Sequence, residues 1–297
     1  MLPLLFLLAM TATIGVQQTP TSTLRENIQR LIEKHNGTVG LSIRNLTSGE
    51  QLEILGDERF PAASVIKIPI MVEAFARVAS GEIDPNLLLT VGRRDKARGS
   101  GILKALSDGS SYRWIDLITM SIALSDNTAT NLLLNRLGVG AVNERMKNLG
   151  LMNTLLFQKV FANKVEVHPE LAKTYGLGMT TPNEMAVLLE RLAKGEILSA
   201  QLSGEMVRIL KAQQNTNMLP RFLPIRDDIQ VAHKTGSMNA VRHDVGIVFT
   251  PRANWVICVM TKDNRDTSWS CDNAAEVLIG RISRTVFDHF SNDTGKF

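Results

Sequence analysis

Strand-type patterning is confined to the two ends of the chain, and this separation constrains the fold more than any other feature of the sequence. Apolar residues typical of strands occupy 39–46 and 51–55, with a turn-forming segment between them. Strand patterns return only at 229–233, 241–250 and 255–261. The long middle of the chain has helical spacing instead, in segments near 65–80, 114–124, 127–137, 141–149 and 182–194.

Helices are expected to complete both end blocks. Helical spacing from Thr23 to His35, with Ser22 or Thr23 as the N-cap, precedes the first strand, and a closing helix is expected from about Asp272 to Phe290. The two ends are therefore predicted to share one α/β lobe, more strictly α+β, around an antiparallel sheet. We place this lobe at residues 21–61 and 206–297, and an inserted helical lobe at 62–205, with the active site between the lobes.

An apolar stretch from Leu2 to Ile14 precedes Arg25, the first charged residue of the chain. Small and polar residues follow this stretch, which is typical of a secretory signal peptide. The stretch is too short to span a membrane, because a spanning helix needs about 20 residues. Residues 1–20 are therefore predicted to be a signal peptide, and the protein to be exported to the periplasm or the exterior without a stable membrane span. The alternative is an apolar helix packed on the domain.

The composition excludes several classes of function. A formal charge of +4 invites a nucleic-acid reading, but the densest basic cluster, residues 93–98, has no interleaved aromatics and is interpreted as a solvated loop. The two cysteines, Cys258 and Cys271, have no matching histidine cluster and give no zinc signature. Cys258 lies in an apolar run and is expected to be buried. Export would allow a disulfide between the two cysteines, but the sequence does not establish one. No cofactor and no nucleic-acid partner are expected, and the protein is expected to be a monomer.

The first candidate for chemistry is a serine with a lysine three residues later. Ser64 falls at a predicted helix N-terminus and Lys67 lies on the same face, about one turn further on. A lysine amine at this spacing can contact the serine hydroxyl and assist its deprotonation. The helix N-terminus adds backbone N–H donors beside a developing oxyanion. This pair alone is a weak signal, because such spacings are frequent on solvated helices.

Two further triplets stand at the predicted lobe boundaries. Ser125-Asp126-Asn127 separates two helical segments and also fits simple N-capping, for which these residue types are preferred. Lys234-Thr235-Gly236 follows the predicted strand 229–233, and the alternative there is a strand end that turns at glycine. Two lysines near one serine would lower each other's pKa and favour a neutral amine, for which Lys67 is the natural candidate.

Together the three motifs, in this order, resemble those of class A β-lactamases and penicillin-binding proteins, and the resemblance extends from about Thr23 to Phe290. It implies a β-lactamase/transpeptidase-like fold with a five-stranded antiparallel sheet flanked by helices. It implies an acyl-enzyme on Ser64, which Lys67 activates. Ser125 would relay a proton to the leaving nitrogen.

The resemblance also implies how substrate is held. Asn127 would hold the side-chain amide of the substrate and contact Lys67. Lys234 and Thr235, with Gly236 in the same segment, would bind the carboxylate found in penicillins and D-Ala-D-Ala peptides. The backbone N–H groups of Ser64 and Ser237 would form the oxyanion hole. Arg242 is interpreted either as a second cation for the carboxylate or as a solvent-exposed residue at a strand end. His243 is interpreted as a structural or surface residue.

The sequence departs from the family in the loop before Thr180-Thr181-Pro182. Class A enzymes use a carboxylate there to aim the water that releases the acyl group. Counting without gaps from Ser125 puts Val160 or Phe161 at that position, whereas matching His168-Pro169-Glu170-Leu171 to the family pattern puts His168 there and Ala172 in place of an asparagine. Glu166 and Glu170 remain candidates if the loop folds differently.

Three functions follow from these observations. The leading one is a serine hydrolase that opens the β-lactam amide. Its rival is a D,D-peptidase that cleaves D-Ala-D-Ala in peptidoglycan, and the shared machinery does not separate the two. A β-lactam sensor or binding module that acylates without turnover is the third. Deacylation is expected to be slow, because neither register of the loop supplies both a carboxylate and its asparagine partner.

Overall fold

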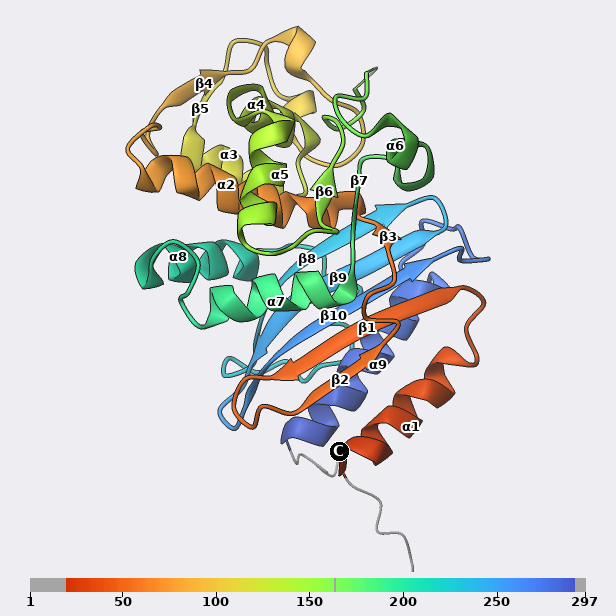
Figure 1. Ribbon diagram of the computed structural model, residues 1–297. Helices are drawn as coiled ribbons and strands as arrows, with labels where there is room; N and C mark the ends of the chain where they lie inside the picture. The colour runs from red at the N-terminus through yellow and green to blue at the C-terminus, as the bar shows by residue number, and fades with distance from the viewer. Residues whose placement is uncertain (1–19, 163, 292–297) are drawn as a thin grey trace, which may run out of the picture.

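A five-stranded antiparallel sheet forms the centre of the protein, as the computed structural model describes it for residues 20–162 and 164–291. The strand order is β2-β1-β10-β9-β8, so strands from both ends of the chain lie side by side (Figure 1). The fold class predicted from the sequence is thereby confirmed. The strands are β1 (Thr38–Asn45), β2 (Gln51–Ile54), β8 (Gln230–Met238), β9 (Val241–Phe249) and β10 (Asn254–Lys262).

Strand β10 shows why the sheet is covered on both faces. Trp255, Ile257 and Val259 join one apolar cluster, while Val256 and Cys258 join the other. Successive side chains of a strand point to opposite faces, so this run of apolar residues requires a helical layer on each side. The first layer consists of α1 (Pro20–Ile32) and α9 (Ala274–Ser291), which contact each other on the same face of the sheet.

The opposite face of the sheet is covered by α7 (Pro182–Ala193) and α8 (Ala200–Lys211). Beyond them lie the remaining larger helices, at the top of Figure 1. Since α7 packs on the sheet and α8 contacts both β8 and α3, these two helices join the predicted lobes, whose exact division stays a prediction. The further helices are α2 (Lys67–Ala79), α3 (Trp114–Ala123), α4 (Asn127–Leu137), α5 (Val139–Asn148) and α6 (Pro169–Tyr175).

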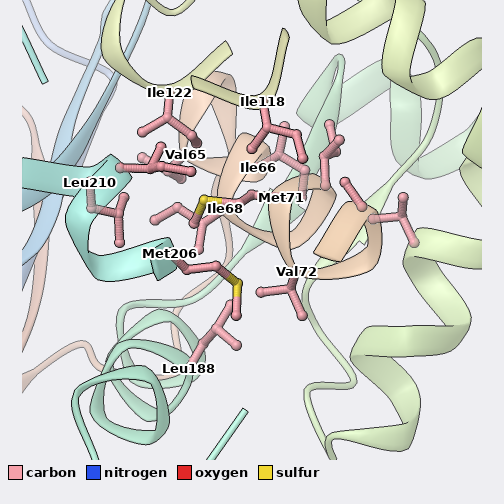
Figure 2. Packing of buried hydrophobic residues seen from close by; sticks show 14 of the residues in the cluster. Val65, Ile66, Ile68, Met71, Val72, Ile118, Ile122, Leu188, Met206 and Leu210 are labelled. Atoms are coloured by element: carbon pink, nitrogen blue, oxygen red, sulfur yellow. The ribbon is translucent and has the colours of Figure 1, made fainter. Parts of the chain in front are cut away.

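Helix α2 is buried through most of its length, because α3, α7 and α8 surround its first turns. Figure 2 shows side chains from these helices, among them Ile118, Leu188 and Met206, converging on Ile68 and Val72. Interiors are close-packed, so a helix held in this way has little freedom to shift. The start of α2 is therefore a rigid platform for the residues that precede it.

Short elements connect the larger ones. Strand β3 (Phe60–Pro61) pairs with β7 (Gly178–Thr180), which also pairs with β6 (Leu155–Leu156), and β4 (Leu88–Thr90) pairs with β5 (Ser111–Arg113). Three 3₁₀ turns complete the set: η1 (Ala63–Ile66), η2 (Arg93–Asp95) and η3 (Leu103–Ala105). The β3–β7 pairing ties the segment before Ser64 to the segment that follows the loop 157–172.

Three sequence predictions need correction or completion. Helix α1 begins at Pro20, so Ser22 and Thr23 lie inside it and neither is its N-cap. Strand β8 does not end at His233 but continues to Met238, so Gly236 lies within the strand rather than at a turn. Helices α6 and α8 were not predicted, and α6 has only 7 residues.

The predicted signal peptide lies almost wholly outside the described residues. Within the described part of the chain, none of the helices combines the length and apolar character needed to cross a membrane. Cys258 is buried, as predicted, and Cys271 is exposed, and both are free thiols. Burial raises the pKa of the Cys258 thiol, so it behaves as a small apolar residue.

Candidate active site

Ser64 lies in η1, the 3₁₀ turn that runs directly into α2. Its side chain is half-buried and lines a pocket with a volume of about 1090 Å³. Strand β8 passes so close to this turn that a Cβ on Gly236 would lie 3.2 Å from the backbone nitrogen of Ser64. A side chain at that position would push the strand away from the serine, which explains the glycine of the Lys-Thr-Gly motif.

Lys67 is fully buried one turn after Ser64, and its hydrogen bonds reach the loop between α3 and α4. Its Nζ donates to the carbonyl of Ser125 at 2.7 Å, to Ser125 Oγ at 3.1 Å and to Asn127 Oδ1 at 2.7 Å. Burial, and secondly the positive charge of Lys234, hold the pKa of this amine well below its usual range. The expected depression of the Lys67 pKa is therefore found.

The Ser125-Asp126-Asn127 loop is held by its central residue. Asp126 caps α4, accepting from the backbone N–H of Ala129 at 2.9 Å, and also accepts from the N–H groups of Ile102 and Leu103. Capping and catalysis were alternatives in the sequence, but the capping role falls on Asp126 alone. Ser125 has a left-handed backbone, with φ of 51°, and lines the pocket.

Asn127 is fixed from both ends of its amide. Its Oδ1 accepts from Lys67, and its Nδ2 donates to the carbonyl of Arg98 at 2.8 Å. A carbonyl can only accept, so these contacts establish which end of the amide faces which partner. One Nδ2 hydrogen remains for a ligand.

Strand β8 forms the opposite wall of the pocket. Thr235 and Ser237 line it, while Lys234 is fully buried and donates to the carbonyl of Thr235 at 2.8 Å. Burial lowers the pKa of Lys234 to about 7, although the carboxylate of Asp244 acts in the opposite direction. The two lysines of the motifs thus lie in one buried region beside Ser64.

The loop 157–172 brings apolar residues to the pocket and leaves its acids outside. Val160 and Phe161 line the pocket, together with Gln158 and Ala162. Glu166 and His168 are exposed, and the described pocket lining includes neither of them. Glu170 is also exposed and forms an ion pair with Lys173 on α6. Of the two registers, the ungapped one is that whose residues, Val160 and Phe161, line the described pocket.

Arg242 is buried, so the reading of it as a solvent-exposed strand-end residue is wrong. Its Nε donates to Glu276 at 3.1 Å, and its two Nη atoms donate to the carbonyls of Met238, Val241 and Ser268. The guanidinium also lies 4.6 Å from the ring centre of Trp269. One N–H of Nη2 is left over by these bonds.

His243 has a structural role, which is one of the two interpretations that the sequence allowed. It is buried, and its Nε2 donates to the carbonyl of Pro61 at 2.7 Å, while its Nδ1 accepts from the backbone N–H of Thr261 at 3.1 Å and also lies 2.8 Å from the carbonyl of Arg242. Burial lowers the pKa of His243 to about 4, although the carbonyls of Pro61 and Arg242 act in the opposite direction, so the ring is neutral at pH 7. The side chain connects β9 to the strand that leads to Ser64.

Several pocket residues had no signal in the sequence. Most of them belong to loops whose positions depend on the tertiary fold: the turn at 98–100, the start of the loop 157–172, the segment after α8 and the segment before α9. Amide side chains are frequent among them. The residues are Arg98, Gln158, Gln213, Gln214, Asn215, Asn217, Trp269, Cys271 and, in α9 itself, Glu276.

The fold and the three assembled motifs define a class, the penicillin-recognising serine hydrolases, in which a serine at a helix start is activated by a lysine one turn later. The chain belongs to the beta-lactamase enzyme family, whose sequence pattern matches residues 23–290.

Individual relatives agree with this membership. The β-lactamase VEB-1 of Pseudomonas aeruginosa is 24% identical over 301 residues, covering 97% of each chain. A crystal structure of a β-lactamase from Sphaerobacter thermophilus is 33% identical, with a TM-score of 0.81, and covers 91% of this chain and 98% of that one. A structure of PBP-A with a leucine-to-glutamate substitution, described as an acyl-enzyme complex with penicillin G, is 31% identical, has a TM-score of 0.78 and covers 91% and 97%.

Proposed function

We propose that the protein is a class A-like β-lactam hydrolase that forms an acyl-enzyme on Ser64 rapidly and releases it slowly. Family membership supports the reaction class. The observation that carries the site assignment is the buried Lys67 amine, which has a depressed pKa and contacts Ser125 and Asn127 one turn after a pocket-lining serine. Slow release of the acyl group is inferred from the apolar side chains of Val160 and Phe161, which line the pocket.

Acylation begins with the neutral form of Lys67. A protonated Lys67 amine donates to all three of its acceptors, whereas the neutral amine keeps two hydrogens for the Ser125 carbonyl and Asn127 Oδ1, which can only accept, and has a lone pair that can accept a proton from a hydroxyl. The amine takes the proton of Ser64 as Oγ attacks the lactam carbonyl. The C–N bond then breaks, and the proton passes through the Ser125 hydroxyl, 3.1 Å from Nζ, to the leaving nitrogen.

Substrate is held on both sides of the serine. Lys234 and Thr235 bind the substrate carboxylate, and Gly236 keeps the strand close to Ser64, whereas the buried Arg242 is not among the residues that line the described pocket. Charged hydrogen bonds of this kind contribute about 1.5–3 kcal/mol each. The free Nδ2 hydrogen of Asn127 binds the side-chain amide. Backbone N–H groups of Ser64 and Ser237 stabilise the oxyanion, which is the larger contribution to the rate.

Hydrolysis of the ester requires a water molecule with a base beside it. The water oxygen bonds to the acyl carbon, the ester C–O bond breaks, and the proton returns to Ser64. The apolar Val160 and Phe161 supply no base at the pocket wall, and the exposed Glu166, His168 and Glu170 are not among the residues that line the described pocket. A missing general base costs about 10²–10⁴-fold in rate.

A D,D-peptidase acting on peptidoglycan is a second candidate, because none of the carboxylates described in the loop 157–172 lines the pocket. The same Lys234 and Thr235 contacts suit the terminal carboxylate of a D-Ala-D-Ala peptide. A sensor or binding module that acylates without turnover is the limiting case of slow release. Export to the periplasm or exterior and a monomeric state belong to the same proposal.

Mass spectrometry of the intact protein, followed over time after addition of a penicillin, tests the proposal. We expect an adduct of the penicillin's mass within seconds, which then declines over minutes. Permanent retention of the adduct identifies the sensor. Release of D-alanine from a D-Ala-D-Ala peptide at a rate above penicillin turnover identifies the peptidase. No adduct on the wild-type protein, with normal unfolding behaviour, contradicts the assignment of Ser64.

A further inference from the structure

Two walls of the pocket touch through Phe161 on the loop 157–172 and the Arg98–Gly99 turn before η3. The Phe161 side chain is 56% exposed although it lines the pocket. The Arg98 guanidinium lies 5.4 Å from its ring centre. A Cβ on Gly99 would lie 2.9 Å from Phe161 Cε2, so the ring rests against the glycine backbone. We name this contact the Arg98–Phe161 clasp.

The backbone on each side of the clasp is anchored. Val160 is bonded through both its N–H and its carbonyl to the side chain of Asn131. The N–H of Ala162 donates to the carbonyl of Lys159 at 3.2 Å. Between these anchors Phe161 has a left-handed backbone, with φ of 54°, which bulky residues rarely adopt. The strained backbone is held in place by its surroundings and presents the ring toward the pocket.

The opposite wall is anchored to the start of α4. The Arg98 carbonyl accepts from Asn127 Nδ2 at 2.8 Å, and the Ser100 carbonyl accepts from the Asn127 backbone N–H at 3.1 Å. The Ala97 N–H donates to Thr128 Oγ1 at 3.0 Å. Both walls are therefore rigid, and the clasp is a preformed feature rather than a loose contact of surface side chains.

The clasp lies next to the amide of Asn127. A Cβ on Gly99 would contact Asn127 Nδ2 at 2.8 Å as well as the Phe161 ring, so amide and ring border the same small space. In the proposed function this amide holds the acylamino group of the substrate. The substituent that extends beyond that group then meets the exposed face of Phe161 first.

We propose that the Arg98–Phe161 clasp is a specificity-determining wall that favours β-lactams with an aromatic acylamino substituent. The inference rests on the proposed function and deepens it. An aromatic substituent can stack against the edge or face of Phe161, and the Arg98 guanidinium keeps that ring in place. A substrate without an acyl group gains nothing from the wall.

The test compares benzylpenicillin, which has an aromatic acyl group, with 6-aminopenicillanic acid, which has none. The second-order rate constant of acylation is measured for each by intact-protein mass spectrometry. We expect Phe161→Ala to lower the constant for benzylpenicillin about tenfold and to leave that for 6-aminopenicillanic acid within about twofold. Phe161→Tyr keeps the ring and should restore the preference.

Ile225→Ala supplies the control, because Ile225 is fully exposed and lies outside the pocket lining. Thermal unfolding of each variant checks that the fold is retained. Equal losses for both substrates, or no loss for either, overturn the role of the clasp while leaving acylation of Ser64 intact. If the wild-type protein forms no adduct with either compound, the proposed function fails and the specificity wall fails with it.

Discussion

Asn131 holds the backbone of Val160 with both ends of its side-chain amide. Its Nδ2 donates to the Val160 carbonyl at 3.0 Å, and its Oδ1 accepts from the Val160 N–H at 2.9 Å. Asn131 belongs to α4, four residues after Asn127, so this pair of bonds fixes the loop to the helix that carries the site. The position thus presented to the pocket has an apolar side chain.

Replacing Val160 by glutamate should supply the missing base. The Asn131 bonds involve only the backbone of residue 160, so they survive the change and direct the new carboxylate into the pocket. We expect Val160→Glu to accelerate release of the penicilloyl group by about 10²-fold or more, with acylation changed far less. Rapid-quench measurement of adduct formation and decay separates the two steps.

The exposed acids of the same loop supply matched controls for this prediction. Glu166→Gln and Glu170→Gln remove a carboxylate each without touching the pocket wall, so we expect the decay of the adduct to be unchanged. A tenfold slower decay in either variant would show that the loop changes its conformation during the reaction and that one of these acids reaches the ester.

Ser64→Ala should abolish both the adduct and hydrolysis. The side chain is half-buried at the start of a packed helix, so removing one hydroxyl should leave the unfolding temperature nearly unchanged. A fluorescent penicillin run on a denaturing gel detects the covalent label. Labelling that persists in the variant identifies a different nucleophile.

The charge of Lys234 should set how acylation depends on pH. Burial lowers its pKa to about 7, so the free enzyme loses this positive charge as the pH rises through that value. The second-order constant for a penicillin should therefore fall as the pH rises from about 7 to 9, whereas that for the corresponding methyl ester, which has no carboxylate to bind, should not. Parallel falls for both compounds would place the titration elsewhere, for example on the chemical step.

Lys234→Ala extends the same argument to neutral pH. Loss of one charged hydrogen bond should slow acylation by a carboxylate-bearing penicillin about 10- to 100-fold. The methyl ester should lose much less. Equal losses for the two compounds would mean that Lys234 acts on the reacting bond rather than on the carboxylate.

Local sequence patterns predicted much of the fold and the residues of the three motifs. The hairpin β1–β2, the strands β9 and β10 and the helix after Ser64 follow from apolar periodicity, which depends on near neighbours alone. The extension of β8 through Lys234 to Met238 was not predicted, because pairing with β9 keeps polar and glycine residues in a strand that their own propensities oppose.

The walls of the site could not be read from the sequence for a related reason. Val160 and Phe161 were identified only by counting, and a competing register pointed to His168. What holds Val160 at the pocket is the pair of bonds from Asn131, a contact across 29 residues that leaves no local pattern. The burial of Arg242 likewise depends on Ser268 and Glu276, which come from distant segments of the chain.

The neutral ring of His243 should make the protein sensitive to mild acid. Its pKa is about 4 in the folded protein and about 6.5 in the unfolded chain, so the unfolded state binds the proton first as the pH falls. The free energy of unfolding should therefore decrease progressively between about pH 6.5 and pH 4, by about 3 kcal/mol in total from this group.

His243→Gln keeps an amide that can donate to the Pro61 carbonyl and does not titrate. Urea unfolding at pH 7, 5.5 and 4.5 should then show a shallower pH dependence in this variant than in the wild type, whatever its stability at neutral pH. His168→Gln is the control, because His168 is exposed and its loss should leave the slope as it is. Identical slopes for wild type and His243→Gln would mean that the ring accepts a proton without breaking the link between β9 and the strand before Ser64.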